Sequence, residues 1–475
     1  MSRKSVLQLC AVVCLAALLA PAAAGAASGD DGVPASYRAA LAAAGIPLTA
    51  ASIVVRALDG GPLELRAHSA APVSPASTMK LVTSYAALGI LGSAYTWNTQ
   101  VLARGARRED LLDGDLVLRG GGDPGMVIER FWLLVQRVRA LGIREIRGDL
   151  LLDRSAYAPV AYDPQAFDGA DTRAYNAGPD PLLVNFNAVS YELRPDEAAG
   201  LVRVTITPAV SRSAAATVPA ISGPCGDWRA QLRLDLGNPL DPVFRGNYPS
   251  SCGIRTIHAL APDPDAYVER VFRVLWENSG GIWRGRARGT PGAVAGARLL
   301  LDYESRPLGD VVHDMNKFSN NVMARMVFLS LAREESPEPA TAARAAAVVR
   351  RWLASRGIAA PELVLENGAG LSRLERVSAN TLAALLADAY ASPWMPELMS
   401  SLPVVGVDGT MKTRRAAAGS AHIKTGLLQG VRAIAGYVRA QSGRRYVVVA
   451  IVNHRRAAAA GAANDALLQW VYESG

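Results

Sequence analysis

The sequence predicts an α+β fold in which one antiparallel sheet, built from both ends of the chain, is covered by helices. Strand-like runs lie near the start of the chain, at residues 52–68, and near its end, at residues 432–454. Apolar residues at helical spacing follow the first run and return from residue 310 onward. Between them, residues 97–298 are mainly short β-like runs broken by Gly and Pro. A single sheet from the two ends, with the middle of the chain inserted, is the simplest assembly.

The first strand-like run predicts a hairpin that leads into a helix. In "SIVVRALDGGPLELRAH", Asp59-Gly60-Gly61 separates two β-rich halves, which is typical of a hairpin turn. The later stretch "TMKLVTSYAALGIL" has apolar residues at helical spacing, so Ser77 is expected at or just inside a helix N-terminus. Ser77 and Lys80, three positions apart, then share one face of that helix.

The expected domain boundaries follow from these strand-like and helical patterns. Residues 28–96 and 299–475 form one domain, and the inserted region 97–298 divides into two subdomains, the second at about 195–285. The glycines at 120–122 indicate a tight turn and not a phosphate loop, because no Lys-Ser/Thr follows them. Helical patterns at 310–332, 339–357 and 378–392 precede two C-terminal strands, "RAIAGYVRA" and "RRYVVVAIVNH", and a last helix, "AANDALLQWVYES".

Residues 1–27 predict an export signal that is removed from the mature protein. Arg3 and Lys4 give a basic start, an apolar run extends from Val6 to Ala20, and small residues follow around Ala24. The run is too short for a membrane span, so no transmembrane anchor is expected.

Export changes the interpretation of the cysteines. Cys10 and Cys14 leave with the signal, and the remaining pair, Cys225 and Cys252, predicts a disulfide in an oxidising compartment. The five histidines are scattered without ligand-like spacing, which argues against a metal site. The net charge of +8 comes without a lysine-rich run or a basic stretch interleaved with aromatic residues, so a nucleic acid is not an expected partner.

Lysine is rare in this chain, and its positions point to chemistry. Of 50 Lys and Arg residues only five are lysines, which are Lys4, Lys80, Lys317, Lys412 and Lys424. A desolvated lysine can lose its proton and act as a base, whereas arginine stays charged. Lys80 stands in "SPASTMK", so Ser77-x-x-Lys80 is a candidate nucleophile and base.

Two further motifs follow Ser77-x-x-Lys80 in the chain. "FSNN" gives Ser319 and Asn321 in a region with a helical pattern, and "HIKTG" gives Lys424, Thr425 and Gly426, which we expect just before a strand. Each motif alone is weak, but the order Ser-x-x-Lys, Ser-x-Asn, Lys-Thr-Gly is that of the active-site serine enzymes that handle penicillin.

The residue types fit an acyl transfer. Lys80 would take the Ser77 proton if burial and positive charge lower its pKa, and Lys424 supplies part of that charge. Ser319 would relay the proton to the leaving amine while Asn321 holds Lys80 and the substrate amide. These four side chains and Ser77 are the expected catalytic groups.

A second set of groups would bind the substrate. The backbone N–H groups of Ser77 and Leu427 are the expected oxyanion hole. Thr425 and Lys424 would receive a substrate carboxylate, and Gly426 would let the substrate backbone lie against the edge strand.

These motifs and several other stretches carry a family resemblance. The chain resembles the class C low-molecular-mass penicillin-binding proteins, the D-alanyl-D-alanine carboxypeptidases and endopeptidases of peptidase family S13. "SPASTMKLVTSYAAL", "GDLVLRGGGDP", "YNAGPDPLLVNFN", "ENGAGLSR", "VDGTMKTR" and "KTGLLQGVRAIAGYV" echo family stretches in order. The resemblance implies a β-lactamase/transpeptidase-like domain with two inserted, mainly β domains.

The resemblance also implies substrates and further site residues. It implies a periplasmic serine enzyme without a cofactor, acting on peptidoglycan stem peptides and inhibited by β-lactam antibiotics. Family members hold the diaminopimelate side chain of the stem with an acid, an arginine and a glutamine. The matching positions here are Asp153 in "LLLDRSAY", Arg373 in "GLSR" and Gln429 in "KTGLLQG".

This chain departs from the family pattern at a few positions. Leu427 stands where a serine is frequent, which removes a hydrogen bond to the substrate carboxylate, and Asn320 replaces the usual Asp of the second motif. Two alternatives stay open from the residues alone: a β-lactamase or esterase on the same scaffold, and a non-catalytic cell-wall binding protein. Against the first stands the long insertion; against the second stand the intact motif residues.

Overall fold

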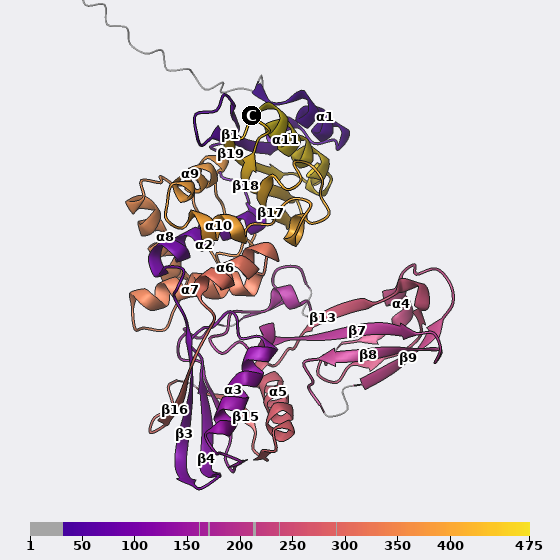
Figure 1. Cartoon of the computed structure of the whole chain (residues 1–475), viewed down its shortest axis with the longest axis vertical. Coiled ribbons are helices and arrows are strands. Elements are labelled where there is room, and N and C mark those ends of the chain that lie inside the picture. The colour runs from indigo at the N-terminus through magenta and orange to yellow at the C-terminus, as the bar shows by residue number, and fades with distance from the viewer. Residues whose placement is uncertain (1–31, 161, 170–171, 212–214, 237, 291) are drawn as a thin grey trace, which may run out of the picture.

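The computed structural model describes residues 32–160, 162–169, 172–211, 215–236, 238–290 and 292–475. The expected export signal, with Cys10 and Cys14, lies outside the described residues. Among the described residues, no helix has the length and apolar character needed to cross a membrane. The two ends of the described chain meet in one lobe, and the inserted strands form the rest of the molecule (Figure 1).

One antiparallel sheet joins the two ends of the chain. Its strand order is β17-β18-β19-β1-β2, and β1 pairs with β19 so that Ile53 lies opposite Ala450. The bounds are β1 (Ala51–Ala57), β2 (Glu64–Ala67), β17 (Ala421–Leu428), β18 (Val431–Arg439) and β19 (Arg445–Asn453). The hairpin expected around Asp59-Gly60-Gly61 is confirmed by the antiparallel pairing of β1 with β2.

Helices cover both faces of this sheet. Successive residues of β19 point to opposite faces, so Val447 and Val449 pack into one apolar cluster and Tyr446 and Val448 into another. The first cluster includes helices α2 (Lys80–Leu91), α7 (Asn321–Glu335), α8 (Ala342–Ser355) and α9 (Ala379–Tyr390). The second includes α1 (Ala35–Ala43) and α11 (Gly461–Ser474). The expected α+β class, a sheet covered by helices, is confirmed.

The inserted region contains two larger sheets. The first combines β3 (Asn98–Arg108), β4 (Leu111–Arg119), β5 (Glu145–Ile146), β6 (Leu150–Asp153), β14 (Ile282–Trp283), β15 (Ala287–Thr290) and β16 (Arg298–Glu304). Helices α3 (Ile128–Ala140) and α5 (Pro264–Asn278) pack against it. The expected end of the insertion, at residue 298, falls at the start of β16, which pairs with β3 and so belongs to the inserted sheet.

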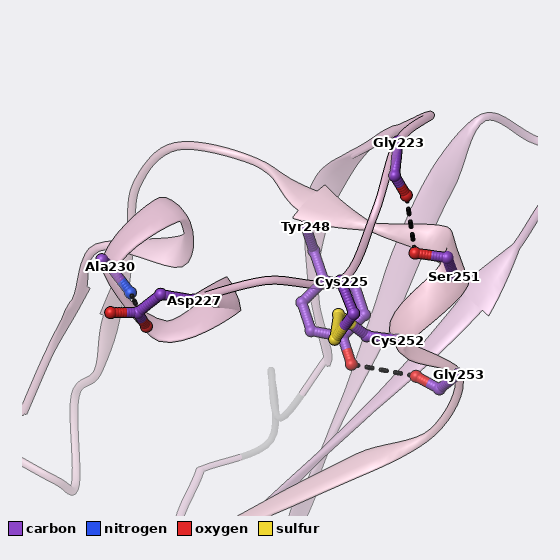
Figure 2. Close-up of a disulfide and its surroundings, with 8 residues drawn as sticks. All are labelled: Gly223, Cys225, Asp227, Ala230, Tyr248, Ser251, Cys252 and Gly253. Carbon is purple, nitrogen blue, oxygen red and sulfur yellow. Dashed lines mark hydrogen bonds between the residues drawn. A yellow bond between two sulfur atoms is a disulfide. The ribbon is translucent and has the colours of Figure 1, made fainter.

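The second inserted sheet has the order β12-β9-β8-β7-β13. Its strands are β7 (Ala188–Asp196), β8 (Leu201–Thr207), β9 (Ala215–Ile221), β12 (Tyr248–Pro249) and β13 (Arg255–Leu260). The disulfide expected from the sequence is present beside it, joining Cys225 to Cys252 with 4.7 Å between their Cα atoms (Figure 2). Closing this loop of 27 residues stabilises the subdomain by about 3 kcal/mol in the chain-entropy description.

Two local expectations need correction. The helical pattern at 310–332 forms two helices, α6 (Leu308–Lys317) and α7, separated by a break at Ser319. The break occurs because the side chain of Asn320 caps α7 by accepting a hydrogen bond from the Met323 N–H at 3.1 Å. The Lys424-Thr425-Gly426 motif lies inside strand β17 and not before it, since all three residues pair with β18.

Candidate active site

Ser77 lies in the turn that starts helix α2. A short 3₁₀ helix, Ala76–Met79, precedes α2, and Ala76 has a left-handed φ of 48°. This turn brings the Ser77 hydroxyl back toward the first residue of α2, so the Lys80 Nζ donates to the Ser77 Oγ at 3.0 Å. Ser77 and Lys80 are expected to share one face of the helix, and their side chains do make a direct hydrogen bond.

The break between α6 and α7 supplies the second group of side chains. Ser319 has a left-handed φ of 57°, which is unusual for a residue with a Cβ. Asn321, the first residue of α7, accepts a hydrogen bond from the Lys80 Nζ at its Oδ1 at 2.7 Å. Strained backbone of this kind is often found at functional sites, where the surrounding structure holds it.

The edge strand β17 completes the cluster. The Lys424 Nζ donates to the Ser319 Oγ at 2.9 Å and to the carbonyl of Thr425 at 2.9 Å. Hydrogen bonds join Ser77, Lys80 and Asn321 in one group and Ser319 and Lys424 in a second. The two groups form one site, because Ser319 stands two residues before Asn321 and the charge of Lys424 acts on Lys80. The elements that carry them, α2, α6, α7 and β17, are labelled in Figure 1.

Both lysines of the site are removed from water, and this sets their charge. Lys80 and Lys424 are each 0% exposed. Burial lowers the pKa of Lys80 well below its usual value, Lys424 lowers it further, Glu375 raises it and Arg325 lowers it. Burial also lowers the pKa of Lys424, to about 7. A lysine with a lowered pKa can be neutral at physiological pH and accept a proton.

Residues Thr425 to Leu427 of β17 lie beside the turn that carries Ser77. The Thr425 hydroxyl lies 2.8 Å from the Thr410 hydroxyl. A Cβ at Gly426 would come within 2.7 Å of the Pro75 carbonyl oxygen, so glycine is needed there for the approach of β17 to the nucleophile turn. Leu427 is 57% exposed and presents an apolar side chain next to this position.

Of the three residues expected to hold the stem side chain, Arg373 and Gln429 contact each other, and Asp153 pairs with Arg119. Asp153 is 0% exposed and accepts a hydrogen bond from the Arg119 Nε at 2.7 Å, which helps to lower its pKa against the opposing effect of burial. It is therefore paired inside the inserted sheet. Arg373 does lie beside Gln429, donating to its carbonyl oxygen at 3.1 Å.

Sequence reasoning missed a segment of the insertion that reaches the site. The Asn321 Nδ2 donates to the Tyr175 carbonyl at 3.4 Å, and the Arg373 guanidinium lies 4.8 Å from the centre of the Phe167 ring. Asp168, next to Phe167, accepts a hydrogen bond from Arg173 at 3.0 Å. The part from Tyr175 on, "YNAGPDPLLVNFN", is a stretch that echoes the family, and the aromatic and acidic residues before it, Phe167 and Asp168, are a further signal.

Sequence reasoning also missed Glu375. Its carboxylate is 0% exposed and accepts backbone hydrogen bonds from the loop that contacts Lys80. The nearby "ENGAGLSR" stretch was singled out for Arg373 alone.

This arrangement defines a class of enzyme before any comparison. A serine hydrogen-bonded to a neutralisable lysine, beside a second serine that is hydrogen-bonded to a lysine from an edge strand, is the constellation of hydrolases that work through a serine acyl-enzyme. A family model matches residues 37–474, and the chain belongs to the D-Ala-D-Ala carboxypeptidase 3 (S13) family. It is a serine-type hydrolase of the penicillin-binding carboxypeptidase and endopeptidase group.

Relatives agree with this membership. The chain is 31% identical over 407 residues to a D-alanyl-D-alanine carboxypeptidase of Actinomadura sp. (strain R39), covering 80% of this chain and 73% of that protein. It is 25% identical over 384 residues to the D-alanyl-D-alanine carboxypeptidase DacB of Haemophilus influenzae, covering 80% of each.

Solved structures share the fold. Penicillin binding protein 4 of Haemophilus influenzae matches with a TM-score of 0.71 at 23% identity, covering 89% of this chain and 96% of that one. The endopeptidase Bd0816 of Bdellovibrio bacteriovorus matches with a TM-score of 0.51 at 15% identity, covering 88% and 92%. These likenesses support the α+β fold expected from the sequence.

Proposed function

We propose that Ser77 is the nucleophile and Lys80 its general base in the hydrolysis of D-alanyl-D-alanine peptides of peptidoglycan. The observation that carries this assignment is the 3.0 Å hydrogen bond between the Lys80 Nζ and the Ser77 Oγ in a site where the lysine is wholly buried. A neutral Lys80 accepts the hydroxyl proton as Ser77 Oγ attacks the carbonyl carbon of the penultimate D-Ala.

The tetrahedral intermediate is stabilised by backbone donors. The N–H groups of Ser77 and Leu427 point to the oxyanion from the nucleophile turn and from the edge strand β17. This assignment is supported by the close approach of β17 to the nucleophile turn, where Gly426 would clash with the Pro75 carbonyl if it carried a Cβ.

The proton then passes to the leaving group. Lys80 holds the proton near Asn321 and Ser77, and Ser319, which is hydrogen-bonded to Lys424 at 2.9 Å, relays it to the departing amine nitrogen. The C–N bond breaks, the amine leaves, and a Ser77 ester remains. A water molecule, deprotonated by Lys80, hydrolyses the ester and restores the serine.

The substrate carboxylate binds on the outer face of β17. Lys424 and Thr425 are the proposed partners, because the Lys424 Nζ reaches the Thr425 carbonyl at 2.9 Å and the Thr425 hydroxyl is available as a further donor in the same residue. A β-lactam presents a similar carboxylate and carbonyl, so it acylates Ser77 and is released slowly.

The diamino acid side chain of the stem peptide binds beside Arg373. Arg373 and Gln429 are retained from the sequence prediction because they lie side by side. We assign the acidic partner to Asp168 in place of Asp153, because Asp168 follows Phe167, the ring that Arg373 covers. Both acids are ion-paired, but the Asp168 side chain, paired with Arg173, is 19% exposed, whereas that of Asp153, paired with Arg119, is 0% exposed. The amino and carboxyl groups at the end of such a side chain fit an acid and an arginine.

The cellular setting is proposed from the sequence. Residues 1–27 read as a cleaved signal, and a disulfide between Cys225 and Cys252 fits the oxidising periplasm. The peptidoglycan layer lies in the same compartment.

The experiment is release of D-alanine from a purified pentapeptide stem and cleavage of cross-linked dimer muropeptides by residues 28–475. Activity that disappears in Ser77→Ala supports the assignment, and the substrate consumed separates carboxypeptidase from endopeptidase action. Full turnover by Ser77→Ala would refute the nucleophile. Rapid recovery from penicillin would favour a β-lactamase, and the absence of any acyl adduct would favour a cell-wall binding protein.

A further inference from the structure

Glu375 is a buried carboxylate next to the catalytic lysine for which the mechanism above has no role. It lies in the loop between Arg373 and helix α9 and is 0% exposed. Its own N–H donates to the Ser372 Oγ at 3.0 Å, which fixes the start of the side chain. A buried carboxylate is costly unless hydrogen bonds or charges compensate it, so its partners indicate what it does.

Four backbone N–H groups of one short loop converge on this carboxylate. The Oε1 accepts from Glu366, Asn367 and Gly368 at 3.1, 2.9 and 2.8 Å. The Oε2 accepts from Gly370 at 2.9 Å. The fifth N–H of the loop, that of Ala369, donates to the Asn367 Oδ1 at 2.9 Å. Every N–H from 366 to 370 is thereby satisfied, and four of the five bonds end on Glu375.

With its N–H groups turned toward Glu375, the loop presents carbonyls to helix α2. The Gly368 carbonyl accepts from the Thr83 Oγ1 at 2.6 Å, and the Ala369 carbonyl accepts from the Lys80 Nζ at 2.6 Å. The loop also touches the nucleophile turn, since a Cβ at Gly370 would lie 1.9 Å from the Ala76 carbonyl oxygen. The position of one of the three hydrogen-bond partners of Lys80 therefore depends on Glu375.

The charge of Glu375 acts on the same lysine. The groups that bond Lys80 are Ser77, Asn321 and the Ala369 carbonyl. The charged groups that act on it are Lys424 and Arg325, which are cationic, and Glu375, which is acidic. Burial raises the pKa of Glu375 above its usual value, and the backbone N–H groups of the loop offset part of that rise. The geometry of four N–H donors favours the ionised carboxylate, because a protonated acid would give up one acceptor position.

We propose that Glu375 is a positioning residue for catalysis, which folds residues 366–370 so that the Ala369 carbonyl holds the Lys80 amine against Ser77 and supplies the counter-charge of that amine. The inference rests on the proposed roles of Ser77 and Lys80. It adds a buried group that touches neither the substrate nor the reacting atoms and acts through the loop.

The test is the rate of acylation by a fluorescent penicillin, measured from pH 5 to pH 10 on residues 28–475. In Glu375→Gln the amide cannot accept at its nitrogen, so the loop loosens and the rate at the optimum falls about tenfold. The counter-charge is also lost, so the acidic limb of the pH profile moves down by about one pH unit. Glu375→Asp keeps the charge but shortens the reach, so its rate falls without movement of the limb.

The matched control is Glu362→Gln. Glu362 also accepts a backbone N–H, from Ser378 at 3.0 Å, and a hydroxyl, from Thr381 at 2.6 Å, but it serves the start of α9. This variant is expected to lower the melting temperature and leave the pH profile in place.

Failure of the Glu375 role and failure of the proposed function give different results. The role of Glu375 is overturned if Glu375→Gln changes neither the acylation rate nor the position of the acidic limb of the pH profile. It is also overturned if Glu362→Gln shifts that limb equally. If Glu375→Gln does not fold, an unchanged optimum rate in Glu375→Asp overturns it. An acyl adduct that persists in Ser77→Ala would instead refute the proposed function, whatever Glu375 does.

Discussion

Lys317 gives the sharpest test of how the structure holds Ser319. Lys317 is the last residue of α6, two positions before Ser319, and is 6% exposed. Its Nζ donates to the Leu402 carbonyl at 2.8 Å and to the Asp408 Oδ2 at 2.7 Å. Lys317→Met keeps the length of the apolar stem and removes both bonds, so we expect the chain near Ser319 to lose its anchor.

The stability lost in Lys317→Met depends on how costly the unpaired Asp408 carboxylate is. Removing one member of a fully buried ion pair costs about 3–5 kcal/mol. The Asp408 side chain is 39% exposed, so water compensates part of its charge, and the loss is about 2 kcal/mol. That corresponds to a fall in melting temperature of roughly 4–8 °C for a domain of this size.

The pH dependence has a definite sign. Burial raises the pKa of Asp408, and Lys317 and the Val404 N–H together lower it below the ordinary 3.8. A lowered folded-state pKa adds stability above the unfolded value, and this stability is lost as the pH falls through the folded value. The difference between the wild type and Lys317→Met is therefore full at pH 7 and shrinks below about pH 4.

The assay is urea unfolding followed by tryptophan fluorescence at pH 7 and pH 3.5, together with the penicillin acylation rate. Lys412→Met is the matched control, because Lys412 is an exposed lysine in the same region; it should change stability by less than about 0.5 kcal/mol. Equal losses in the two variants at pH 7, with equal acylation rates, would refute the anchoring role of Lys317.

Three further predictions concern other parts of the chain. Asp123 is 3% exposed, its Oδ2 has no hydrogen-bond partner among the described residues, and burial raises its pKa to about 6. Its ionised form is therefore destabilising in the folded protein, so Asp123→Asn should stabilise the protein by up to about 3 kcal/mol at pH 7.5. Near pH 3.5, where the acid is protonated, urea unfolding should show no effect. Cys225→Ser with Cys252→Ser should lower stability by about 3 kcal/mol without changing acylation at 25 °C, and a loss of acylation in the folded variant would contradict the separation of the disulfide from the site. Gly426→Ala should cut acylation more than tenfold and lower stability by about 1–3 kcal/mol, because the new Cβ pushes β17 off Pro75. A wild-type rate would count against that packing.

Much of the scaffold is predictable because it depends on local pattern. The continuous apolar, valine-rich run in "RRYVVVAIVNH" and the turn residues Asp59-Gly60-Gly61 predict strands that the structure contains. The pair Cys225 and Cys252 predicts a bond that the structure makes. Each of these inferences needs only the residue types within a short window, or an even number of cysteines, and no knowledge of what lies across the molecule.

Other features fail to follow from local pattern because a partner far along the chain decides them. The apolar spacing of 310–332 predicts one helix, but the Asn320 cap and the left-handed Ser319 break it. Asp153 looks like an available acid until its pairing with Arg119 on β4 is known. Glu375 stands out in no local pattern, and its role depends on the four backbone N–H groups that surround it in the fold.

The sequence by itself determined the class of chemistry, since Ser77, Lys80, Ser319, Asn321 and Lys424 are recognisable by type and order. It also determined the fold class, since the spacing of apolar residues and the residue types of the turns depend only on neighbouring positions in the chain. Only the tertiary structure decided how acidic or basic each group is and which groups meet. Burial and the field of distant charges set the pKa of Lys80, and these depend on packing between segments hundreds of residues apart in the chain.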